Sequence, residues 1–359
     1  MKNDHLKIVI SGGGTGGHIF PAIAIADTMK KHYPDAEILF VGAQGRMEME
    51  RVPKAGYPIE GLWISGFTKD ASALILPFKI VSSLFKARSI LKKFNPDVVI
   101  GVGGFASGPT LKAASWLGIP TVIQEQNSYP GKTNRNVGKN ASAICTAYEQ
   151  MEQWFPAGRI HLTGNPLRKG ITNIDIERSV AAEHFGLDPE KPTALVVGGS
   201  QGALGINIGI SAGLDKFSDS GMQLIWQTGK NYKQRADEEV KKLGLSNKVK
   251  PVVFIDHMEY AYCLADIVIS RAGAISISEL SIVGKPVIFV PLPTAAEDHQ
   301  TKNAMRLVNA NAALIVENKN AEKELVDQMM QLANDKNRRA TLMENIKHFA
   351  QPDAAEKIA

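Results

Sequence analysis

A glycine-rich segment and the histidine that follows it are the residues of this chain whose types and spacing point most directly to chemistry. Residues 12–17 contain five glycines, follow an apolar run and end directly before His18. Glycines let backbone N–H groups approach a ligand and aim a helix N-terminus at it, which suits an anion. A histidine with an ordinary pKa of about 6.5 can accept a proton from a hydroxyl group. We therefore expect His18 to act on a bound ligand rather than only to pack locally.

This first segment matches neither of the two best-known phosphate loops. It satisfies Gly-x-Gly-x-x-Gly, but the acidic residue expected to end a second strand is missing, because Asp35 precedes that strand. No Lys-Ser/Thr pair follows, which excludes a Walker loop. Alone, the segment indicates no particular ligand.

Further polar groups follow other apolar runs. A second glycine segment, residues 198–202, offers backbone amides and the Ser200 hydroxyl to a diphosphate. Glu279 follows a glycine turn at Gly273, where a carboxylate can accept hydrogen bonds from ribose hydroxyls. A polar cluster at residues 297–303 suits a sugar. Taken alone, Glu279 and this cluster fit a solvated surface equally well.

The sequence predicts no metal site and no other cofactor. Many nucleotide-sugar enzymes hold a metal through an Asp-x-Asp pattern at a strand end, but the nearest approach, residues 175–177, follows no predicted strand. Helix N-termini and backbone amides would then stabilise a leaving diphosphate. The two cysteines, Cys145 and Cys263, lie far apart, which favours a reduced protein without a disulfide framework.

Apolar runs that alternate with helical patterns predict the scaffold for these groups. Strands are predicted at residues 6–11, 37–41, 97–101, 121–125, 143–146, 194–198, 223–227, 252–255, 266–270 and 287–291. Helices are predicted between them, for example at 21–32 and 301–309. Continuous apolar runs are typical of parallel strands covered on both faces. The fold class is therefore α/β, with doubly wound parallel sheets.

The two halves of the chain repeat one pattern. Residues 98–123 and 267–289 each contain a strand, a glycine loop, a helix, a Gly-x-Pro stop and another buried strand. A chain of 359 residues is long for one core. We expect two Rossmann-like domains that meet near residues 164–167, with a ligand cleft at the carboxyl ends of their strands.

Charge is concentrated in one segment. The net charge of +5 is too small to indicate nucleic-acid binding. Residues 69–93 hold six basic residues against one acid, Asp70, and so carry a surplus equal to that of the whole chain. No apolar run approaches the roughly 20 residues that span a bilayer, and no secretory signal is recognisable. A soluble or peripheral protein is expected.

Taken together, the motifs resemble those of the MurG family of peptidoglycan N-acetylglucosaminyltransferases, which make lipid II from lipid I. The matching segments, in family order, are residues 12–21, 101–109, 125–127, 164–168, 198–203, 254–258, 271–279 and 298–300. No single motif is decisive, but the ordered set covers most of the chain and is specific. The resemblance implies a GT-B fold, whose last helix crosses back to the first domain. The implied domains are residues 1–165 with 343–359, for acceptor and membrane, and residues 166–342, for the UDP-sugar donor.

The resemblance also implies the reaction of an inverting hexosyltransferase. The 4-hydroxyl of the muramoyl-pentapeptide in lipid I would attack the anomeric carbon of UDP-N-acetylglucosamine, and UDP would leave with inversion. His18 would be the general base, with Glu125 as the second candidate, and the residues alone do not decide between them. The family works in peptidoglycan synthesis, and hence in cell wall biogenesis, cell shape and cell division. The implied place is the cytoplasmic face of the bacterial plasma membrane, with cell-wall synthesis proteins as further partners.

The family's substrate contacts carry over onto matching positions of this chain. In the first domain they are Thr15, Gly16, Gly17 and Asn127, which the resemblance places against the donor sugar and phosphate. On the donor side they are Arg168, Ser200, Gln201, the backbone of Ile255 for uracil, Ala274, Ile275, Ser276, Ile277, Ser278 and Glu279 for diphosphate and ribose, and Gln300 for the sugar. Phe105 departs from the tyrosine that related sequences often carry, which puts an acid–base or hydrogen-bonding role at that position in doubt.

The resemblance offers an explanation for the basic segment as well. Ile75, Phe78 and Phe85 lie among its cations, and Trp116 adds a further apolar side chain. An amphipathic element of this kind suits the boundary of an anionic lipid membrane. The alternative is an ordinary core helix with a solvated basic face.

Three other functions remain open. A related GT-B transferase acting on diacylglycerol or a sterol would differ in its donor and acceptor. A UDP-sugar epimerase of the same fold would form product without any acceptor. A nucleotide-binding scaffold would have lost catalysis, although the intact His18 argues against that function.

Overall fold

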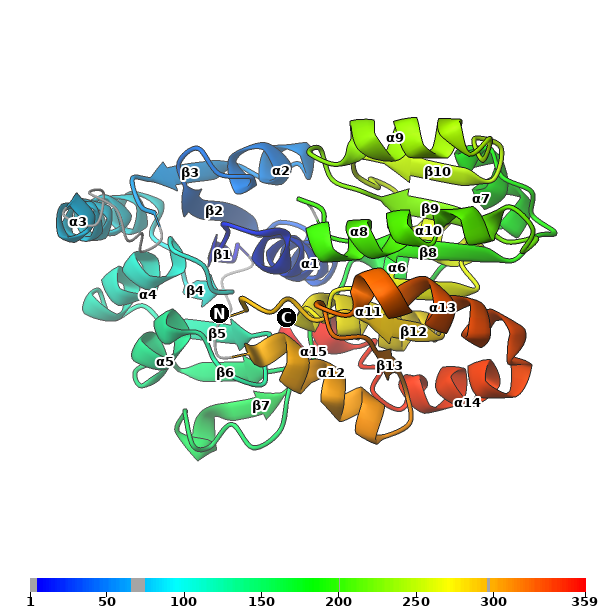
Figure 1. Cartoon of the computed structure of the whole chain (residues 1–359). Coiled ribbons are helices and arrows are strands. Elements are labelled where there is room, and N and C mark those ends of the chain that lie inside the picture. The colour runs from blue at the N-terminus through cyan, green and yellow to red at the C-terminus, as the bar shows by residue number, and fades with distance from the viewer. Residues whose placement is uncertain (1–4, 66–74, 200, 296–297) are drawn as a thin grey trace. The chain divides into compact units, whose positions relative to one another are not determined.

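The chain forms two α/β units in a computed structural model that describes residues 5–65, 75–199, 201–295 and 298–359 (Figure 1). One unit comprises Met1–Arg168 together with Gln351–Ala359, and the other comprises Lys169–Ala350. The boundary therefore follows residue 168 rather than residue 165, and the return begins at residue 351 rather than 343.

The first unit is built on a parallel sheet of seven strands in the order β3-β2-β1-β4-β5-β6-β7 (Figure 1). Its strands are β1 Lys7–Ser11, β2 Glu37–Ala43, β3 Ile59–Leu62, β4 Val98–Gly101, β5 Thr121–Glu125, β6 Ala143–Thr146 and β7 Ile160–Leu162. β1 lies between β2 and β4. The chain thus winds first to one side of β1 and then to the other, as in Rossmann-like folds.

Helices cover both faces of this sheet. They are α1 Gly16–His32, α2 Glu48–Lys54, α3 Leu76–Phe94, α4 Ser107–Trp116, α5 Lys132–Gly138 and α15 Ala354–Ile358. Side chains alternate along β1, so Ile8 packs into a core that also holds Ile25 of α1 and Ile358 of α15. Val9 faces the opposite core, with Leu91 of α3.

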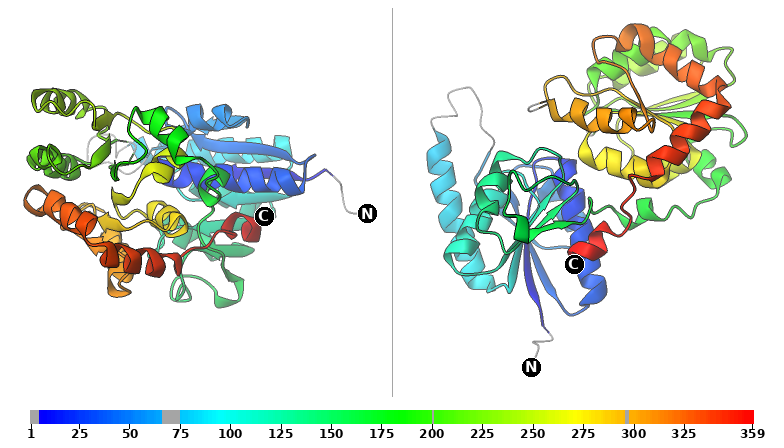
Figure 2. Two further views of the ribbon diagram at one scale, coloured as in Figure 1. Left: turned by 90° about the vertical axis from the view of Figure 1, so that its right-hand side faces the viewer. Right: turned by 90° about the horizontal axis from the view of Figure 1, so that it is seen from below.

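The segment Gln351–Ala359 completes the first unit by packing α15 against α1 (Figure 2). Nζ of Lys31 lies 2.6 Å from Oε1 of Glu356, and His32 contacts the same carboxylate. A Cβ placed on Gly164 would lie 2.5 Å from Cβ of Gln351. The segment at Gly164, where the chain leaves this unit, and the segment at Gln351, where it returns, are therefore neighbours.

The second unit has a parallel sheet of six strands in the order β10-β9-β8-β11-β12-β13. The strands are β8 Thr193–Val197, β9 Gln223–Gln227, β10 Val249–Val252, β11 Ile267–Ser270, β12 Val287–Phe289 and β13 Leu314–Ile315. β8 takes the place that β1 has in the first unit, since it lies between β9 and β11. The predicted fold class, with two doubly wound parallel sheets, is confirmed.

Helices cover the second sheet on both faces, and a hydrophobic core lies between the sheet and the helices on each face. The helices are α6 Lys169–Thr172, α7 Arg178–Phe185, α8 Leu204–Ala212, α9 Lys233–Lys242, α10 Met258–Leu264, α11 Ala274–Val283, α12 His299–Asn309, α13 Ala321–Asn334 and α14 Lys336–Lys347. Short 3₁₀ turns occur at Ala157–Arg159 of the first unit and at Leu214–Phe217 here. Among the residues that the structure describes, no helix combines the length and apolar character required to cross a bilayer.

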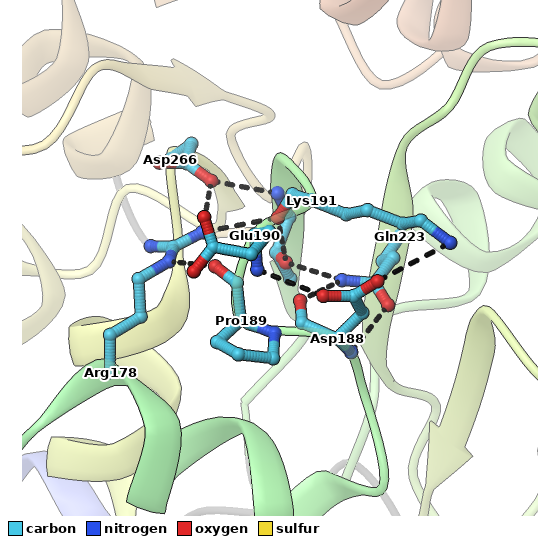
Figure 3. A network of polar contacts seen from close by, with 8 residues as sticks. Arg178, Asp188, Pro189, Glu190, Lys191, Gln223 and Asp266 are labelled. Atoms are coloured by element: carbon cyan, nitrogen blue, oxygen red, sulfur yellow. Dashed lines mark hydrogen bonds and ion pairs between the residues drawn. The ribbon is translucent and has the colours of Figure 1, made fainter.

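A polar network ties the segment before β8 to the amino end of the second sheet (Figure 3). Nη2 of Arg178 donates to Oδ2 of Asp266 at 2.8 Å, and the N–H of Thr193 donates to the same oxygen at 2.8 Å. The side chain of Gln223 donates to the carbonyl of Asp188 and accepts from its N–H, both at 2.8 Å. This end of the sheet is therefore engaged in holding the fold, and none of the candidate substrate contacts lies in the network.

Two elements differ by more than two residues from their predicted bounds. α1 begins at Gly16 rather than residue 21, because the glycines before Pro21 adopt the helical conformation and Thr15 becomes the N-cap. β10 is Val249–Val252 rather than 252–255. Lys250 and Pro251 interrupt the apolar pattern there, and proline is tolerated because β10 is an edge strand.

Candidate active site

The candidate residues of the first unit lie at the carboxyl edge of its sheet. β1, β4 and β5 run parallel, so the loops that follow them leave at the same edge. These loops are residues 12–15, 102–106 and 126–131. Ligands of open α/β sheets bind at this edge.

His18 lies in the first turn of α1 rather than at the end of a loop. Its Nδ1 is 3.2 Å from Oγ1 of Thr15, and its N–H donates to the Thr15 carbonyl at 3.1 Å. Burial lowers the pKa of His18 to about 4, against the opposing effect of a hydrogen bond to the Gly13 backbone. The imidazole is therefore neutral at pH 7, with one N–H donor and one nitrogen lone pair. Such a group can accept a proton.

The glycine loop after β4 packs on this histidine. Gly103 has a φ of 90°, and a Cβ there would lie 2.9 Å from Cδ2 of His18. Any side chain at residue 103 would therefore displace the imidazole. Phe105 of the same loop is 42% exposed. Its ring carries no hydroxyl group, so this position contributes no acid–base chemistry.

The carboxylate of Glu125 is enclosed by four donors. Oε1 accepts from the N–H of Asn127 at 3.0 Å and from its Nδ2 at 3.2 Å. Oε2 accepts from the N–H of Gly131 at 3.2 Å and from Nδ2 of Asn134 at 2.9 Å. The residue is 1% exposed, and burial raises its pKa while these hydrogen bonds lower it. Glu125 thus holds the loop between β5 and α5 in shape.

The other candidates of the first unit are Gly16, Gly17, Asn127 and Arg168. Gly16 and Gly17 form the start of α1, where backbone N–H groups lack helical partners. Asn127 is held against Glu125. Arg168 is the last residue of this unit, although the prediction placed it in the second domain, and its guanidinium carbon lies 4.4 Å from the centroid of the Phe20 ring.

In the second unit, the glycine segment joins β8 to α8. Gln201 is exposed, and Ser200 lies outside the described residues. Asn207 of α8 supports the segment, since its Nδ2 donates to the Thr228 carbonyl at 2.8 Å and its Oδ1 accepts from Nε1 of Trp226 at 3.0 Å. A Cβ on Gly202 would lie 2.1 Å from that same carbonyl oxygen, so the loop rests directly on the turn after β9.

The N-terminus of α11 is the candidate anion-binding feature of the second unit. Gly273 is its N-cap, and the backbone N–H groups of Ala274, Ile275 and Ser276 form the first turn. Ile277 is buried and Ser278 donates to the Ala274 carbonyl at 3.1 Å. This turn follows β11 and so lies at the carboxyl edge of the sheet.

Glu279 follows one turn later on α11 and is 9% exposed. Its Oε2 accepts from the hydroxyl of Tyr262 at 3.0 Å. Glu279 is therefore held by a partner from α10 and is no ordinary solvated helix glutamate.

Ile255 lies in the loop after β10, and Gln300 lies in the first turn of α12, which follows the loop after β12. Ile255 is buried between β10 and α10 and lines a pocket of about 610 Å³ beside the edge strand β10. Next to this pocket the ring of His184 stacks on Tyr260 with 4.8 Å between centroids. Oε1 of Gln300 accepts from the N–H of Leu292 at 3.0 Å, which anchors the start of α12 to the loop after β12.

Arg271 holds the loop after β12 at the same edge of the sheet through hydrogen bonds. Its Nη1 donates to the carbonyls of Val290 and Pro291 at 2.9 and 3.0 Å and to Oδ1 of Asn318 at 2.8 Å. Burial lowers the pKa of Arg271 to about 10, so the guanidinium stays charged at pH 7. Among the described residues, no group of three or more His, Cys, Asp and Glu side chains could hold a metal ion.

A second surface of interest is α3. Phe78, Val81 and Phe85 are 72%, 53% and 66% exposed, whereas the helix buries Ser83, Ala87 and Leu91 on its other side. Ile75 and, on the neighbouring α4, Trp116 are also exposed. Phe78 and Phe85 are therefore surface residues of the unit and do not belong to its core.

Sequence reasoning missed several residues that support the site. They are Glu48, Asn134, Asn207 and Tyr262. All four are buried polar residues whose partners lie in other elements of the fold. No local spacing marks such residues, because the hydrogen bonds that define them form only in the folded chain.

Comparison with known proteins identifies the family. The N-terminal and C-terminal domain models of glycosyltransferase family 28 match residues 8–146 and 193–358. A Cytophaga hutchinsonii protein is 52% identical over 98% of this chain and 95% of its own length, and a Bacteroides fragilis protein is 50% identical over 100% and 95%. Both are named UDP-N-acetylglucosamine--N-acetylmuramyl-(pentapeptide) pyrophosphoryl-undecaprenol N-acetylglucosamine transferase. The crystal structure of Acinetobacter baumannii MurG, at 28% identity, has a TM-score of 0.75 over 98% of each chain.

The two parallel α/β units, together with the N-terminal and C-terminal family models that match the chain, identify a sugar-nucleotide glycosyltransferase. The chain belongs to glycosyltransferase family 28 and, within it, to the MurG transferases.

Proposed function

We propose that this chain transfers N-acetylglucosamine from UDP-N-acetylglucosamine to the 4-hydroxyl of the muramoyl-pentapeptide in lipid I. The product is lipid II, formed with inversion at the anomeric carbon. The observation that carries the proposal is the 52% identity, over 98% of the chain, to a relative named for this transfer. The neutral, partly buried imidazole of His18 at the edge of the first sheet supports it.

In the proposed step, the acceptor hydroxyl gives its proton to the imidazole of His18. Its oxygen forms the new bond to the anomeric carbon, and the bond from that carbon to the diphosphate breaks, so that UDP leaves with the electron pair. A diphosphate close to the imidazole favours the imidazolium and raises its pKa, which makes His18 a stronger base with substrate bound.

His18 is a better candidate for the base than Glu125. Each oxygen of Glu125 already accepts two hydrogen bonds, and the residue is 1% exposed. A substrate hydroxyl would have to displace these donors before it could reach the carboxylate. Glu125 is therefore assigned a positioning role for Asn127 and Asn134.

The second unit is proposed to hold the donor. The N-terminus of α11 and the glycine segment after β8 suit the diphosphate. The carboxylate of Glu279 suits the ribose hydroxyls, and the backbone of Ile255 suits the uracil edge. Gln201 and Gln300 complete the set toward the phosphate and the sugar. Charge on the leaving group is then stabilised by amides and helix dipoles, with no metal in the proposed mechanism.

The first unit is proposed to bind an anionic membrane surface from the cytoplasmic side, through α3. Phe78, Val81 and Phe85 are spaced by three and four residues and so share one helix face. Arg88, Lys92 and Lys93 on the same helix are exposed and can pair with lipid phosphates. Apolar side chains within a basic surface are the pattern of an interfacial helix, and a lipid-linked acceptor requires such a location.

The test is a transfer assay with purified protein. UDP-N-acetylglucosamine, UDP-glucose and UDP-galactose are each offered with lipid I, diacylglycerol or a sterol as acceptor. Product only from UDP-N-acetylglucosamine with lipid I is expected. Product from the donor alone would indicate an epimerase, and preference for another lipid would indicate a different transferase.

His18→Ala tests the proposed base in the same assay. This variant should abolish transfer and leave UDP affinity nearly unchanged, and full activity in it would exclude His18 as the base.

A further inference from the structure

A buried carboxylate lies beneath the first glycine loop. Glu48 is the first residue of α2 and is 1% exposed. Its Oε2 accepts from the N–H of Gly14 at 2.9 Å, and its Oε1 accepts from the N–H of Ala43 at 3.0 Å. Ala43 ends β2, and Gly14 lies in the loop after β1. One side chain therefore ties the glycine loop to the neighbouring strand.

The surroundings of Glu48 leave space for this contact only because they are glycine. A Cβ on Gly13 would lie 2.2 Å from Oε1 of Glu48, and a Cβ on Gly42 would lie 2.6 Å from its Cγ. A glycine loop has many accessible backbone conformations, so holding one of them requires contacts from outside the loop. The carboxylate supplies such a contact through its hydrogen bond from Gly14, while the hydrogen bond from Ala43 fixes the carboxylate to β2.

The anchored loop leads directly to His18. Gly14 is joined to Thr15, whose Oγ1 lies 3.2 Å from Nδ1 of His18 and whose carbonyl accepts the His18 N–H at 3.1 Å. On the other side, a Cβ on Gly104 would lie 2.2 Å from the carbonyl oxygen of Gly13, so the loop after β4 rests on the same peptide. A displacement of Gly14 would therefore move both the N-cap of α1 and the imidazole.

A purely local role for Glu48 does not account for these contacts. An acidic residue in the first turn of a helix ordinarily stabilises that helix through its dipole. Here each oxygen accepts from a backbone N–H outside α2, and one of these N–H groups lies one residue before Thr15.

We propose that Glu48 is a positioning residue for the transfer: it fixes the first glycine loop so that the imidazole of His18 meets the acceptor hydroxyl. This inference rests on the proposed function, and in particular on His18 as the base.

Glu48→Gln is the informative variant, because the amide keeps the shape of the side chain but turns an N–H₂ group toward one of the two backbone N–H donors. Its matched control is Glu50→Gln, an exposed acid on the same short helix. For both variants, kcat and KM in the transfer assay, UDP affinity, melting temperature and the NMR resonance of the His18 Cε1–H are measured.

We expect Glu48→Gln to lower kcat by about 100-fold, the scale of a roughly 1 Å misplacement of a reacting group. UDP affinity should stay close to the wild-type value, because the proposed uracil and ribose contacts, Ile255 and Glu279, belong to the second unit. The His18 resonance should shift in Glu48→Gln and stay in place in Glu50→Gln. If Glu48→Gln does not fold, Glu48→Asp keeps the charge but shortens the reach, and it should show the same loss of kcat and the same shift.

Two results with the Glu48 variants would overturn the inference. One is a wild-type kcat in the Glu48 variants, and the other is a lowered kcat with an unmoved His18 resonance, since the loss would then not pass through the imidazole. Inactive His18→Ala beside fully active Glu48→Gln would refute the positioning role alone. Full activity in His18→Ala would refute the proposed base and the positioning role together.

Discussion

The hydroxyl of Tyr262 on α10 donates a 3.0 Å hydrogen bond to Oε2 of Glu279 on α11. Tyr262 is 2% exposed and Glu279 is 9% exposed, so the contact is shielded from bulk water. A hydrogen bond to a carboxylate stabilises one orientation of the group. Because Glu279 is the proposed ribose contact, Tyr262 sets the direction in which its carboxylate meets the nucleotide.

Tyr262→Phe should therefore weaken UDP binding by about 10-fold, the scale of one hydrogen bond to a charged group. Isothermal titration calorimetry with UDP and with 2′,3′-dideoxy-UDP measures the effect. The loss should be confined to UDP, since the dideoxy analogue lacks the hydroxyls that Glu279 would meet. Tyr260→Phe is the matched control on the same helix, and an equal loss for both nucleotides would contradict a role through the ribose.

Glu125 and Asn134 should behave as one structural unit. Glu125→Gln places an N–H₂ group among four donors, so the melting temperature should fall by a few degrees, corresponding to about 1–3 kcal/mol. Asn134→Ala should cost less, and the double variant should lose less than the sum of the two. Differential scanning calorimetry measures these values. Loss of transfer in Glu125→Gln with an unchanged melting temperature would instead favour Glu125 as the base.

The titration of His18 predicts how stability depends on pH. Its pKa is about 4 in the folded chain and about 6.5 when unfolded. Between these values the unfolded chain binds the extra proton, so this residue makes stability rise with pH from about 4 to about 6.5. His18→Gln removes the contribution. The difference in melting temperature between wild type and variant should therefore shift in favour of the wild type across this window, and parallel curves would show that burial does not perturb the histidine.

Because one face of α3 is exposed, the proposed membrane binding can be tested separately from folding. Replacing Ile75, Phe78 and Phe85 together by serine should reduce co-sedimentation with anionic liposomes while the melting temperature stays constant, because these side chains are 46%, 72% and 66% exposed. Residual binding by the basic residues should weaken as salt is added. Leu162→Ser, at a 45% exposed position of the same unit, is the control. If the triple variant lost thermal stability as well as liposome binding, the alternative of a core helix would be favoured.

Strand prediction succeeded at the centre of each sheet and failed at its edges. β1, β4 and β5 of the first unit, for example, were each located to within about one residue. β3, β7 and β13 were missed and β10 was misplaced, and these are the four edge strands of the two sheets. A central parallel strand is covered on both faces and reads as a continuous apolar run. An edge strand is short and partly solvated, so its sequence contains no such apolar run. In β7, for example, His161 and Leu162 are exposed.

The residues of the candidate site likewise fall into those that a local sequence pattern indicates and those that it does not. Glycine loops and His18 beside the first of them could be proposed as candidates because a backbone requirement leaves a local pattern in the sequence. Glu48 and Tyr262 could not be, because each acquires its role from a residue that lies 34 or 17 positions away in sequence. Arg168 was assigned to the wrong side of the boundary, since its contact with Phe20 forms only once the first unit has folded.

The return of the chain to the first unit has a consequence during synthesis on the ribosome. The segment Gln351–Ala359 is translated only after all of Lys169–Ala350, yet Ile358 belongs to the core formed by α1 and β1. While the nascent chain grows, that apolar face of α1 remains uncovered, and the second unit can fold before the first is complete. In topological terms the second unit is an insertion within the first, so the first unit is completed only after the second has been translated.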